Sequence, residues 1–270
     1  RGIGKMKKLL AAATALSGFL ALAGAASAAD PVIEDTVYDW SGFYIGINGG
    51  YAFQDSDEAN LFTDDITPVP VANLGDATDE SRGDIGKLSA EGEFGGLQAG
   101  LNWQSGMLVL GGEADIQLGD IDGKRSGAFS NPSGSFPIDG EATLDLDWFS
   151  TVRGRIGASF DRVLIYATGG VAFGEVDYDL DATEVGGGLL YQTRLNSSKT
   201  EVGFVAGGGV EFAINQNWTV KAEYQYMDLG KVKAKGDVTF IAGGAPTGET
   251  ARTDINAVFQ SVRLGINFKF

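Results

Sequence analysis

Residues 256–270 alternate strictly between two kinds of side chain. One set of alternate positions holds Val258, Gln260, Val262, Leu264, Ile266, Phe268 and Phe270. The other set holds Phe259, Ser261, Arg263, Gly265, Asn267 and Lys269. Successive side chains of a β-strand point to opposite faces, so this pattern predicts a strand with one oily face and one mostly polar face.

The same two-residue period recurs along the chain in segments long enough to cross a membrane as strands, which takes about 9–11 residues each. It predicts strands near 42–54, 92–104, 107–118, 142–160, 163–177, 200–214, 218–229 and 256–270. The 41 glycines and the 10% of aromatic residues also favour short strands and turns over helices. We therefore expect an all-β protein.

The connections between these segments alternate in length. Tight turns are expected at 105–106, 161–162 and 215–217. Long segments rich in Asp, Gly, Ser and Thr are expected to form loops at 55–91, 119–141, 178–199 and 230–255. Short turns on one side and long loops on the other are typical of outer-membrane barrels. The sequence thus predicts an eight-stranded antiparallel transmembrane β-barrel with short periplasmic turns and long extracellular loops, and with both termini in the periplasm.

The N-terminal part is expected to direct export. A basic start at Met6-Lys7-Lys8, an apolar run from Leu9 to Ala26 and the small residues before Ala29 are typical of a secretory signal peptide over residues 1–28. The alternative is a permanent membrane helix, but acidic residues and no basic cluster follow. We expect a periplasmic N-terminal leader at 29–41 and an outer-membrane barrel over 42–270. No later apolar run approaches the ~20 residues that a membrane helix needs.

Charge and residue usage narrow the possible functions. Removing Arg1, Lys5, Lys7 and Lys8 with the signal peptide changes the net charge from −16 to −20. Such an acidic protein repels phosphate backbones, so we expect no nucleic acid partner. The chain has no cysteine, so packing and hydrogen bonds must stabilise it without disulfides. It also has no histidine, which excludes Ser-His and His-Asp catalysis and the commonest metal ligand.

The polar faces of the predicted strands collect charges of both signs, while the opposite faces carry none. This lumen charge network comprises Glu113, Asp115, Asp145, Asp147, Arg153, Arg155, Glu211, Lys221, Glu223, Arg263 and Lys269. A soluble lipocalin-like barrel would have the reverse polarity, with these charges facing water. The near balance of signs favours mutual pairing inside a narrow lumen.

Aromatic residues near the strand ends also favour a membrane barrel, because they predict interfacial girdles. The alternative is that some of them are core residues. They are Trp40, Phe43, Tyr51, Phe53, Trp103, Trp148, Trp218, Tyr224, Tyr226 and Phe270. A stripe of glycines is expected on the lumen face, where it makes room for large side chains such as Tyr44 and Tyr166. It comprises Gly46, Gly50, Gly96, Gly100, Gly170, Gly174, Gly207 and Gly209.

No catalytic, cofactor-binding or metal-ligating residue is assigned, and no cofactor is expected. Asp145 and Asp147 could act as an acid-base pair, but with Arg153 and Arg155 on the same predicted face they are better interpreted as a salt-bridge ladder. The acidic segments 55–58 and 120–123 could hold a weak divalent ion, although such runs are more often solvated loop tips. The glycine-rich 95–100 lies in a predicted strand with no helix after it, so it is not a phosphate loop.

Three segments of the chain have a familiar sequence. They are Asp39-Trp40-Ser41-Gly42-Phe43-Tyr44-Ile45-Gly46-Ile47-Asn48-Gly49-Gly50-Tyr51, Tyr166-Ala167-Thr168-Gly169-Gly170-Val171-Ala172-Phe173-Gly174 and Val262-Arg263-Leu264-Gly265-Ile266-Asn267-Phe268-Lys269-Phe270. They resemble segments of the small outer-membrane proteins of alphaproteobacteria, the porin-family group of roughly 25–31 kDa surface proteins. The resemblance implies an eight-stranded barrel in the cell outer membrane of a Gram-negative bacterium and a role in the cell envelope. Phe270, Phe268 and Ile266 also look like an assembly signal, which implies the outer-membrane assembly machinery as a partner.

Three classes of function remain open. The first is a structural barrel that contributes to envelope integrity, without catalysis, through contacts with outer-membrane lipids and lipopolysaccharide. The second is a narrow ion-conducting pore, although an eight-stranded lumen is just wide enough to be filled by side chains. The third is a surface receptor or adhesin that binds an extracellular ligand through its loops. If that ligand were haem, Tyr191 or Tyr178 would have to ligate the iron, or aromatic packing would have to hold the ring, because the chain has neither histidine nor cysteine.

Overall fold

The computed structural model describes residues 38–54, 57–64, 81–129, 138–186, 189–240 and 245–270. The predicted signal peptide and residues 29–37 of the predicted leader lie outside these ranges, and so do residues 55 and 56 of the acidic segment 55–58. No helix in the described part of the chain is long and apolar enough to cross a membrane. The described part consists of strands β1 (Gly42–Phe53), β2 (Asp57–Asp64), β3 (Ser81–Leu88), β4 (Glu91–Ser105), β5 (Leu108–Phe129), β6 (Ile138–Phe160), β7 (Val163–Gly186), β8 (Leu189–Ala213), β9 (Trp218–Phe240) and β10 (Ala245–Lys269).

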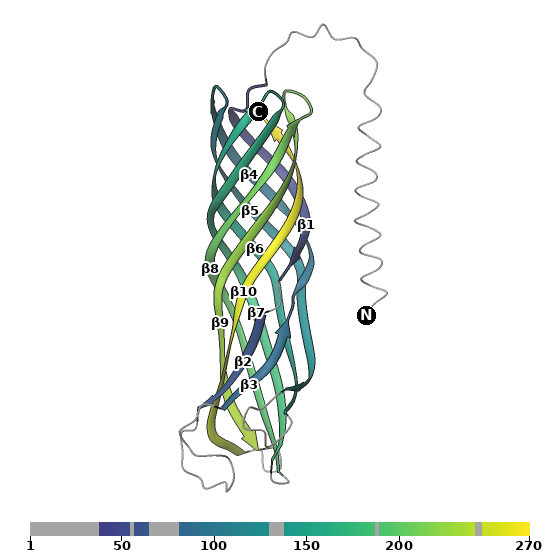
Figure 1. Cartoon of the computed structure of the whole chain (residues 1–270), viewed down its shortest axis with the longest axis vertical. Coiled ribbons are helices and arrows are strands. Elements are labelled where there is room, and N and C mark those ends of the chain that lie inside the picture. Colours follow the sequence, from purple (N-terminus) through teal and green to yellow (C-terminus); the bar gives the residue numbers. More distant parts are fainter. Residues whose placement is uncertain (1–37, 55–56, 65–80, 130–137, 187–188, 241–244) are drawn as a thin grey trace, which may run out of the picture. The chain divides into compact units, whose positions relative to one another are not determined.

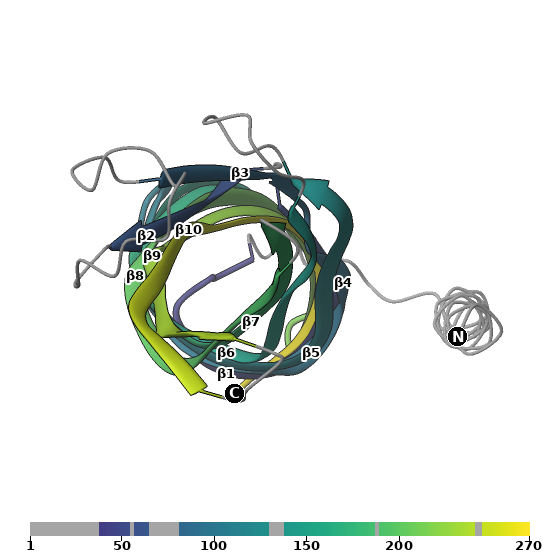
Figure 2. The same cartoon turned by 90° about the horizontal axis from the view of Figure 1, so that it is seen from below.

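The strands form one antiparallel sheet that closes on itself. The order is β1-β4-β5-β6-β7-β8-β9-β10, and β1 also pairs with β10, for example Ile47 with Ile266. These eight strands make a complete ring, which is visible end-on in Figure 2. Closure leaves neither β1 nor β10 as an unpaired edge, so backbone groups on both sides of each find partners. The prediction of an eight-stranded antiparallel barrel is confirmed.

The barrel is much taller than the sequence predicted. Strands β5 to β10 contain 22 to 25 residues each. Three of the four segments assigned to long loops, 119–141, 178–199 and 230–255, are therefore largely strand, and their polar hairpins extend the sheet beyond the membrane-length segments. In the segment 55–91, β2 pairs with β10 through Leu61 and Thr253, and β3 pairs with β2. Figure 1 shows β2 and β3 continuing the wall at the end of the barrel away from the tight turns.

One half of the barrel, next to the tight turns after β4, β6 and β8, has an apolar outer surface. We call this outer surface the apolar belt. Its exposed side chains include Ile47 on β1, Leu101 on β4, Val152 on β6, Phe204 on β8 and Leu264 on β10. These positions alternate with buried polar ones, so the belt is oily outside and polar inside. That is the arrangement that a lipid environment requires.

The second half, which we call the extension, has the opposite polarity. It comprises β2, β3 and residues 119–129, 138–147, 175–186, 189–201, 229–240 and 245–257. Its interior holds the largest apolar cluster of the described residues, with Leu144, Leu180, Leu195 and Ile255 almost completely buried. Charged side chains occupy the outside. The extension is therefore built like a soluble barrel, and it is stacked directly on a membrane-type barrel.

Two β-bulges adjust the alternation where the halves meet. On β6 the pairing with β7 shifts between Leu146 and Trp148, and on β9 the pairing with β10 shifts opposite Asn256 and Val258. An extra residue in one strand moves every following side chain to the other face. Gly230 takes the left-handed conformation, with φ of 82°, in the β9 shift. On β6 the bulge allows leucines instead of aspartates to face the interior of the extension, and on β9 the bulge allows Val232 and Ala234 to do so instead of lysines.

Candidate functional site

The lumen of the belt contains a cluster of buried charged side chains. Eight charged side chains converge in it, and each belongs to a residue no more than 5% exposed. They form a buried network of four acids and four bases. The members are Glu113, Asp115, Arg153, Arg155, Glu211, Lys221, Glu223 and Arg263. Because the signs balance, the network places no net charge inside the barrel.

Arg263 and Arg153 lie at the centre of this network. Arg263 donates to Glu223 Oε1 at 2.6 Å and to Asp115 Oδ2 at 3.1 Å. Arg153 donates to the same two oxygens, at 2.6 Å and 2.8 Å, and also to Glu113. The planar guanidinium groups thus bridge carboxylates from β5 and β9 across the lumen. Such charge-assisted bonds offset the cost of removing the ions from water.

The remaining members complete the pairing. Lys221 Nζ lies 2.8 Å from both carboxylate oxygens of Glu113, and Arg155 lies 2.7 Å from Glu211. Two tyrosines connect these pairs. Tyr44 donates to Glu113 at 2.7 Å and Tyr166 to Glu223 at 2.6 Å. The Arg155 guanidinium also lies 4.0 Å from the centre of the Tyr166 ring, within cation–π range.

Glycines opposite the tyrosines make this packing possible. A Cβ atom on Gly100 would lie 2.3 Å from the Tyr44 hydroxyl, and one on Gly209 would lie 2.8 Å from the Tyr166 hydroxyl. The other predicted lumen glycines, among them Gly46 and Gly170, lie equally close to backbone or side-chain atoms of the neighbouring strands. The predicted reason for the glycine stripe, room for large side chains, therefore agrees with the structure at Gly100 and Gly209, whereas Gly170 and Gly207 lie closest to the backbone of a neighbouring strand.

Amide side chains lie beside the charges in the lumen of the belt. Asn48 donates to Gln98 at 2.9 Å, Gln98 donates to Asn267 at 2.5 Å, and Asn267 donates to Glu211 at 2.8 Å. Asn267 follows Arg263 on the side of the tight turns, whereas Gln117 follows Asp115 on the side of the extension. Gln117 is fully buried and has no protein partner for either side-chain atom. Neutral amides therefore flank the ion pairs on both sides.

The end of the lumen at the tight turns is closed by the residues that precede β1. Trp40 is 1% exposed, and its indole donates to the Asp161 carbonyl at 3.1 Å. The backbone amide of Trp40 donates to Gln104 Oε1 at 2.7 Å. The Tyr38 ring packs edge-on against the Trp40 ring, with 4.8 Å between the ring centres. Burial, with help from the nearby Glu211, raises the pKa of the Tyr38 hydroxyl to about 12. We call Tyr38 and Trp40 the cap; residues 38–41 are the purple trace inside the ring in Figure 2.

The structure brings together eight of the eleven residues predicted as the lumen network and places three elsewhere. Asp147 is exposed and Asp145 is partly exposed, both on the outside of the extension. The bulge on β6 is the reason, because it reverses the alternation that the prediction carried through from Arg153. Lys269 lies at the cap, where its ammonium group contacts the Asp39 carbonyl and sits 4.5 Å from the centre of the Tyr38 ring.

The remaining sequence predictions have mixed outcomes. Of the predicted girdle aromatics, Phe43, Tyr51, Trp103, Trp218 and Tyr224 are exposed on the belt, but Trp40 belongs to the cap. The cap was missed because a two-residue period carries no information on a segment outside the strands. In the predicted assembly signal, the Phe268 ring packs against Trp218 and Phe270, at 5.1 Å and 5.2 Å between ring centres. Recognition of that signal by the assembly machinery stays a prediction.

The residues considered as ligands for haem iron or for a divalent ion are also located by the structure. Tyr178 is 1% exposed in the apolar interior of the extension, so it does not present an iron ligand at the surface. The side chain of Tyr191 lies outside the described residues. Asp120 and Asp122 lie on the outside of β5. In the part of the chain that the structure describes, no group of three or more acidic side chains could hold a metal ion.

A substitution of Asp145 tests whether this residue lies on the outside of the extension. Partial burial and the carboxylates of Asp122, Asp147, Asp177 and Asp179 raise its pKa. A carboxyl group with a raised pKa favours folding at low pH and loses that contribution as the pH rises through the raised pKa. At pH 7 we therefore expect Asp145→Asn to increase the free energy of unfolding. The gain is less than about 1 kcal/mol because solvent screens the repulsion.

Urea unfolding in detergent at pH 7 and at pH 4 checks this expectation, and the gain should disappear at pH 4. Asp139→Asn is the matched control, because Asp139 has Ala128 and Thr183 opposite it instead of carboxylates. If Asp145 were part of the buried lumen network instead, Asp145→Asn would destabilise the barrel at neutral pH.

Comparisons with known proteins agree with this architecture. Residues 13–270 match the family described as "Outer membrane protein beta-barrel domain". The chain is 34% identical over 260 residues to the 31 kDa outer-membrane immunogenic protein of Brucella melitensis, covering 92% of this chain and 95% of that one. It is 31% identical over 198 residues to the 22 kDa outer membrane protein of Rhizobium leguminosarum, covering 73% and 76%.

Solved structures similar to this chain include the outer membrane protein OprG from Pseudomonas aeruginosa, with a TM-score of 0.41 and 13% identity over 85% of this chain and 97% of that one. Neisserial surface protein A aligns with a TM-score of 0.36 and 15% identity over 85% and 98%. The family match and the curated relatives identify the chain. It belongs to the outer membrane protein β-barrel family and is a protein of the Gram-negative cell outer membrane.

Proposed function

We propose that this protein is a structural component of the outer membrane that contributes to envelope integrity, with neither a conducting lumen nor a catalytic site. The observation that carries the proposal is the filling of the lumen. From the tight turns onward the lumen contains the cap, then the charge network with the amides beside it, and finally the apolar interior of the extension. We assign the tight turns to the periplasm and the extension to the cell exterior.

A narrow pore is less well supported by this packing. An ion crossing the lumen would have to displace the central arginines from their carboxylates and then pass an apolar segment lined by residues such as Leu144 and Leu180. Removing an ion from water without compensating partners is costly. The absence of catalysis is supported by the lack of histidine in the sequence and by the ion pairing of the lumen carboxylates described above.

We expect the purified barrel, reconstituted in planar bilayers, to show no single-channel steps across the usual range of voltages. The unboiled protein should also migrate differently from the boiled protein in a detergent gel, which verifies that a folded barrel was tested. A double variant, Trp40→Ala with Leu180→Ala, is the comparison, because it removes large side chains from the cap and from the apolar interior of the extension. Regular conductance steps from the wild-type protein would contradict the proposal and favour the pore.

A further inference from the structure

The outside of the extension is strongly acidic on one side. The strand register sets Glu91 opposite Asp122, Asp122 opposite Asp145 and Asp145 opposite Asp177, so four carboxylates form a row across β4 to β7. Like charges directly opposite each other destabilise a sheet. With two neighbours on the same surface they make up what we call the acidic face: Glu91, Asp122, Asp145, Asp147, Asp177 and Asp179.

A basic surface lies on β9. Lys231, Lys233 and Lys235 are at alternate positions, and all three are exposed on the outside. We call them the lysine strip. The strand register sets Arg252, Asp254 and Asn256 of β10 opposite the three lysines, and these three residues have no net formal charge.

The two surfaces lie on nearly opposite sides of the barrel and at the same level. In the ring, β8 separates β9 from the acidic face on one side, and β10 and β1 separate it on the other. Asp145 lies fifteen residues before Phe160, where β6 reaches its tight turn, and Lys233 lies fifteen residues after Trp218, where β9 leaves its own turn. Each of these stretches contains one bulge, so the two residues are at equal distances from the periplasmic end.

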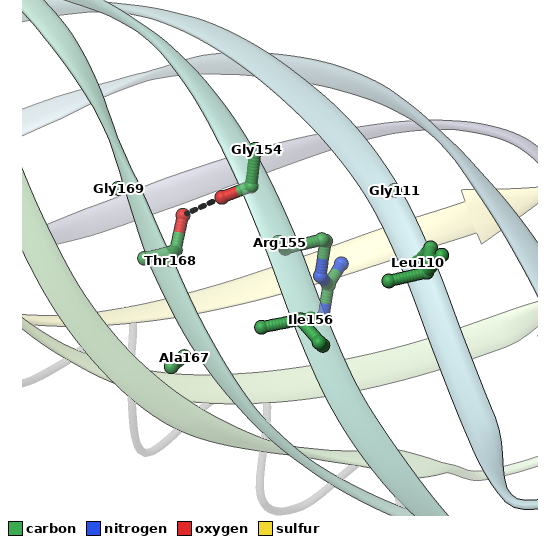
Figure 3. Close-up of a pocket in the computed structure, with 8 residues that line it drawn as sticks. All are labelled: Leu110, Gly111, Gly154, Arg155, Ile156, Ala167, Thr168 and Gly169. Atoms are coloured by element: carbon green, nitrogen blue, oxygen red, sulfur yellow. Dashed lines mark hydrogen bonds between the residues drawn. The ribbon is translucent and has the colours of Figure 1, made fainter.

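The outer surface of the belt below the acidic face also complements, in shape, the outer surface of the belt below the lysine strip. Below the acidic face, a shallow hollow of about 410 Å³ opens between β5, β6 and β7, bordered by Leu110 and Ile156 and floored by Gly154 and Gly169 (Figure 3). Below the lysine strip, Tyr224 and Val262 face each other across β9 and β10, 44% and 52% exposed. Gly154 lies six residues before Phe160, and Tyr224 lies six residues after Trp218.

We infer that the partner of these surfaces is a second copy of this chain, with the acidic face of one barrel against the lysine strip of the next. All copies in one membrane share the same orientation, so two barrels can approach only by turning about the membrane normal. Surfaces at equal height therefore meet. Opposite charges pair in the extension, while Tyr224 and Val262 enter the hollow in the belt. The contact is heterologous, which produces rows or rings of barrels instead of closed twofold dimers.

This inference requires only the outer-membrane location, and it does not depend on whether the lumen conducts. Lys124 and Arg194, two basic residues beside the acidic face, already pair with Glu141 and Asp181, at 2.5 Å and 2.8 Å. A lysine strip from a neighbouring barrel would relieve the repulsion within the carboxylate row. Assembly through this contact would join many barrels, so that the proposed structural role would extend over a larger area of the membrane.

Cysteine cross-linking tests the pairing directly, because the chain has no cysteine of its own. Chains with Asp145→Cys and chains with Lys233→Cys, carrying different tags, are produced together in one cell and oxidised in intact membranes. We expect a mixed disulfide dimer only when both variants are present. Met107→Cys combined with Asp145→Cys is the control, since Met107 is exposed in the tight turn between β4 and β5, at the other end of the barrel from both surfaces. This control should give only collisional background.

Reversing the charges of the lysine strip tests whether electrostatic attraction holds the two barrels together. Adding Lys231→Glu and Lys235→Glu to the Lys233→Cys chain should lower the yield of mixed dimer about fivefold to tenfold. Adding Asp122→Lys and Asp177→Lys to the Asp145→Cys partner should restore it. For every variant, migration of the unboiled protein verifies the fold, whereas conductance separately tests the proposed function.

Two results would overturn the inference. The first is dimer formation by Asp145→Cys alone as efficiently as by the mixture, since that indicates a twofold contact. The second is a yield that charge reversal leaves unchanged. If reversal instead removes co-purifying lipopolysaccharide while the dimer yield stays constant, the lysine strip binds the phosphates of a lipid headgroup and not a second barrel.

Discussion

Replacing Arg263 by methionine is expected to lower the free energy of unfolding by about 3–5 kcal/mol, the range observed when one partner of a buried ion pair is removed. Arg263 is fully buried and contacts three carboxylates of the network, those of Glu223, Asp115 and Glu113. Methionine fills a similar volume, so the loss comes from the charge. It leaves four buried acids facing three bases in a lumen that water cannot enter freely.

Urea unfolding in detergent, followed by tryptophan fluorescence and by the mobility of unboiled protein, measures this loss. The matched control is Arg194→Met, which removes an exposed arginine paired with the exposed Asp181 and should cost no more than about 1 kcal/mol. Adding Glu223→Gln to Arg263→Met restores the balance of charge, so it should recover part of the stability. Equal stability of the Arg263 and Arg194 variants would show that the network does not stabilise the barrel.

Replacing Leu180 by aspartate is expected to open the extension while the belt stays folded. Leu180 is fully buried, and its strand neighbours are Ala142 on β6 and Leu195 on β8, both also buried. A charge at this position has no ionic partner among the described side chains of the apolar cluster. A penalty of about 3 kcal/mol or more would raise the population of opened extension, and with it the rate of proteolysis, by roughly a hundredfold.

Limited proteolysis of the folded protein in membranes detects this opening as the loss of the full-length band and the appearance of several protected belt fragments, because cleavage in the extension separates the hairpins that the tight turns join. Asp179→Asn is the control, because Asp179 is the adjacent residue and lies on the outer face. It should leave the protein as resistant as the wild type. If Leu180→Asp were equally resistant, the apolar interior would not hold the extension together.

The strand count, the closure of the ring and most of the charge network could be predicted from sequence, because each depends on the two-residue period within one segment. The face shared by Arg153 and Arg155 on β6, or by Lys221 and Glu223 on β9, is set by alternation alone. Which carboxylate each base would meet could not be predicted. Pairs such as Arg263 with Asp115 join β10 to β5, and only the closed ring brings these strands across from each other.

The errors arose where the period is interrupted. Asp145 and Asp147 were assigned to the lumen because the alternation was carried through from Arg153 without a break. The adjacent apolar residues Trp148 and Phe149 mark the interruption, and the structure resolves it with a bulge. The cap could not be predicted at all, since Tyr38 and Trp40 lie outside any strand and their main partner, Asp161, is more than a hundred residues away.

By itself, the sequence determined that this protein is a barrel of eight strands with an apolar outer belt and a charged interior behind it. Only the tertiary structure decided that the extension has the reverse polarity. An alternation such as Leu144-Asp145-Leu146-Asp147 separates two faces but does not say which of them points inward. That choice depends on the surroundings, because lipid covers the apolar face in the belt, whereas in the extension the opposite wall of the barrel covers it.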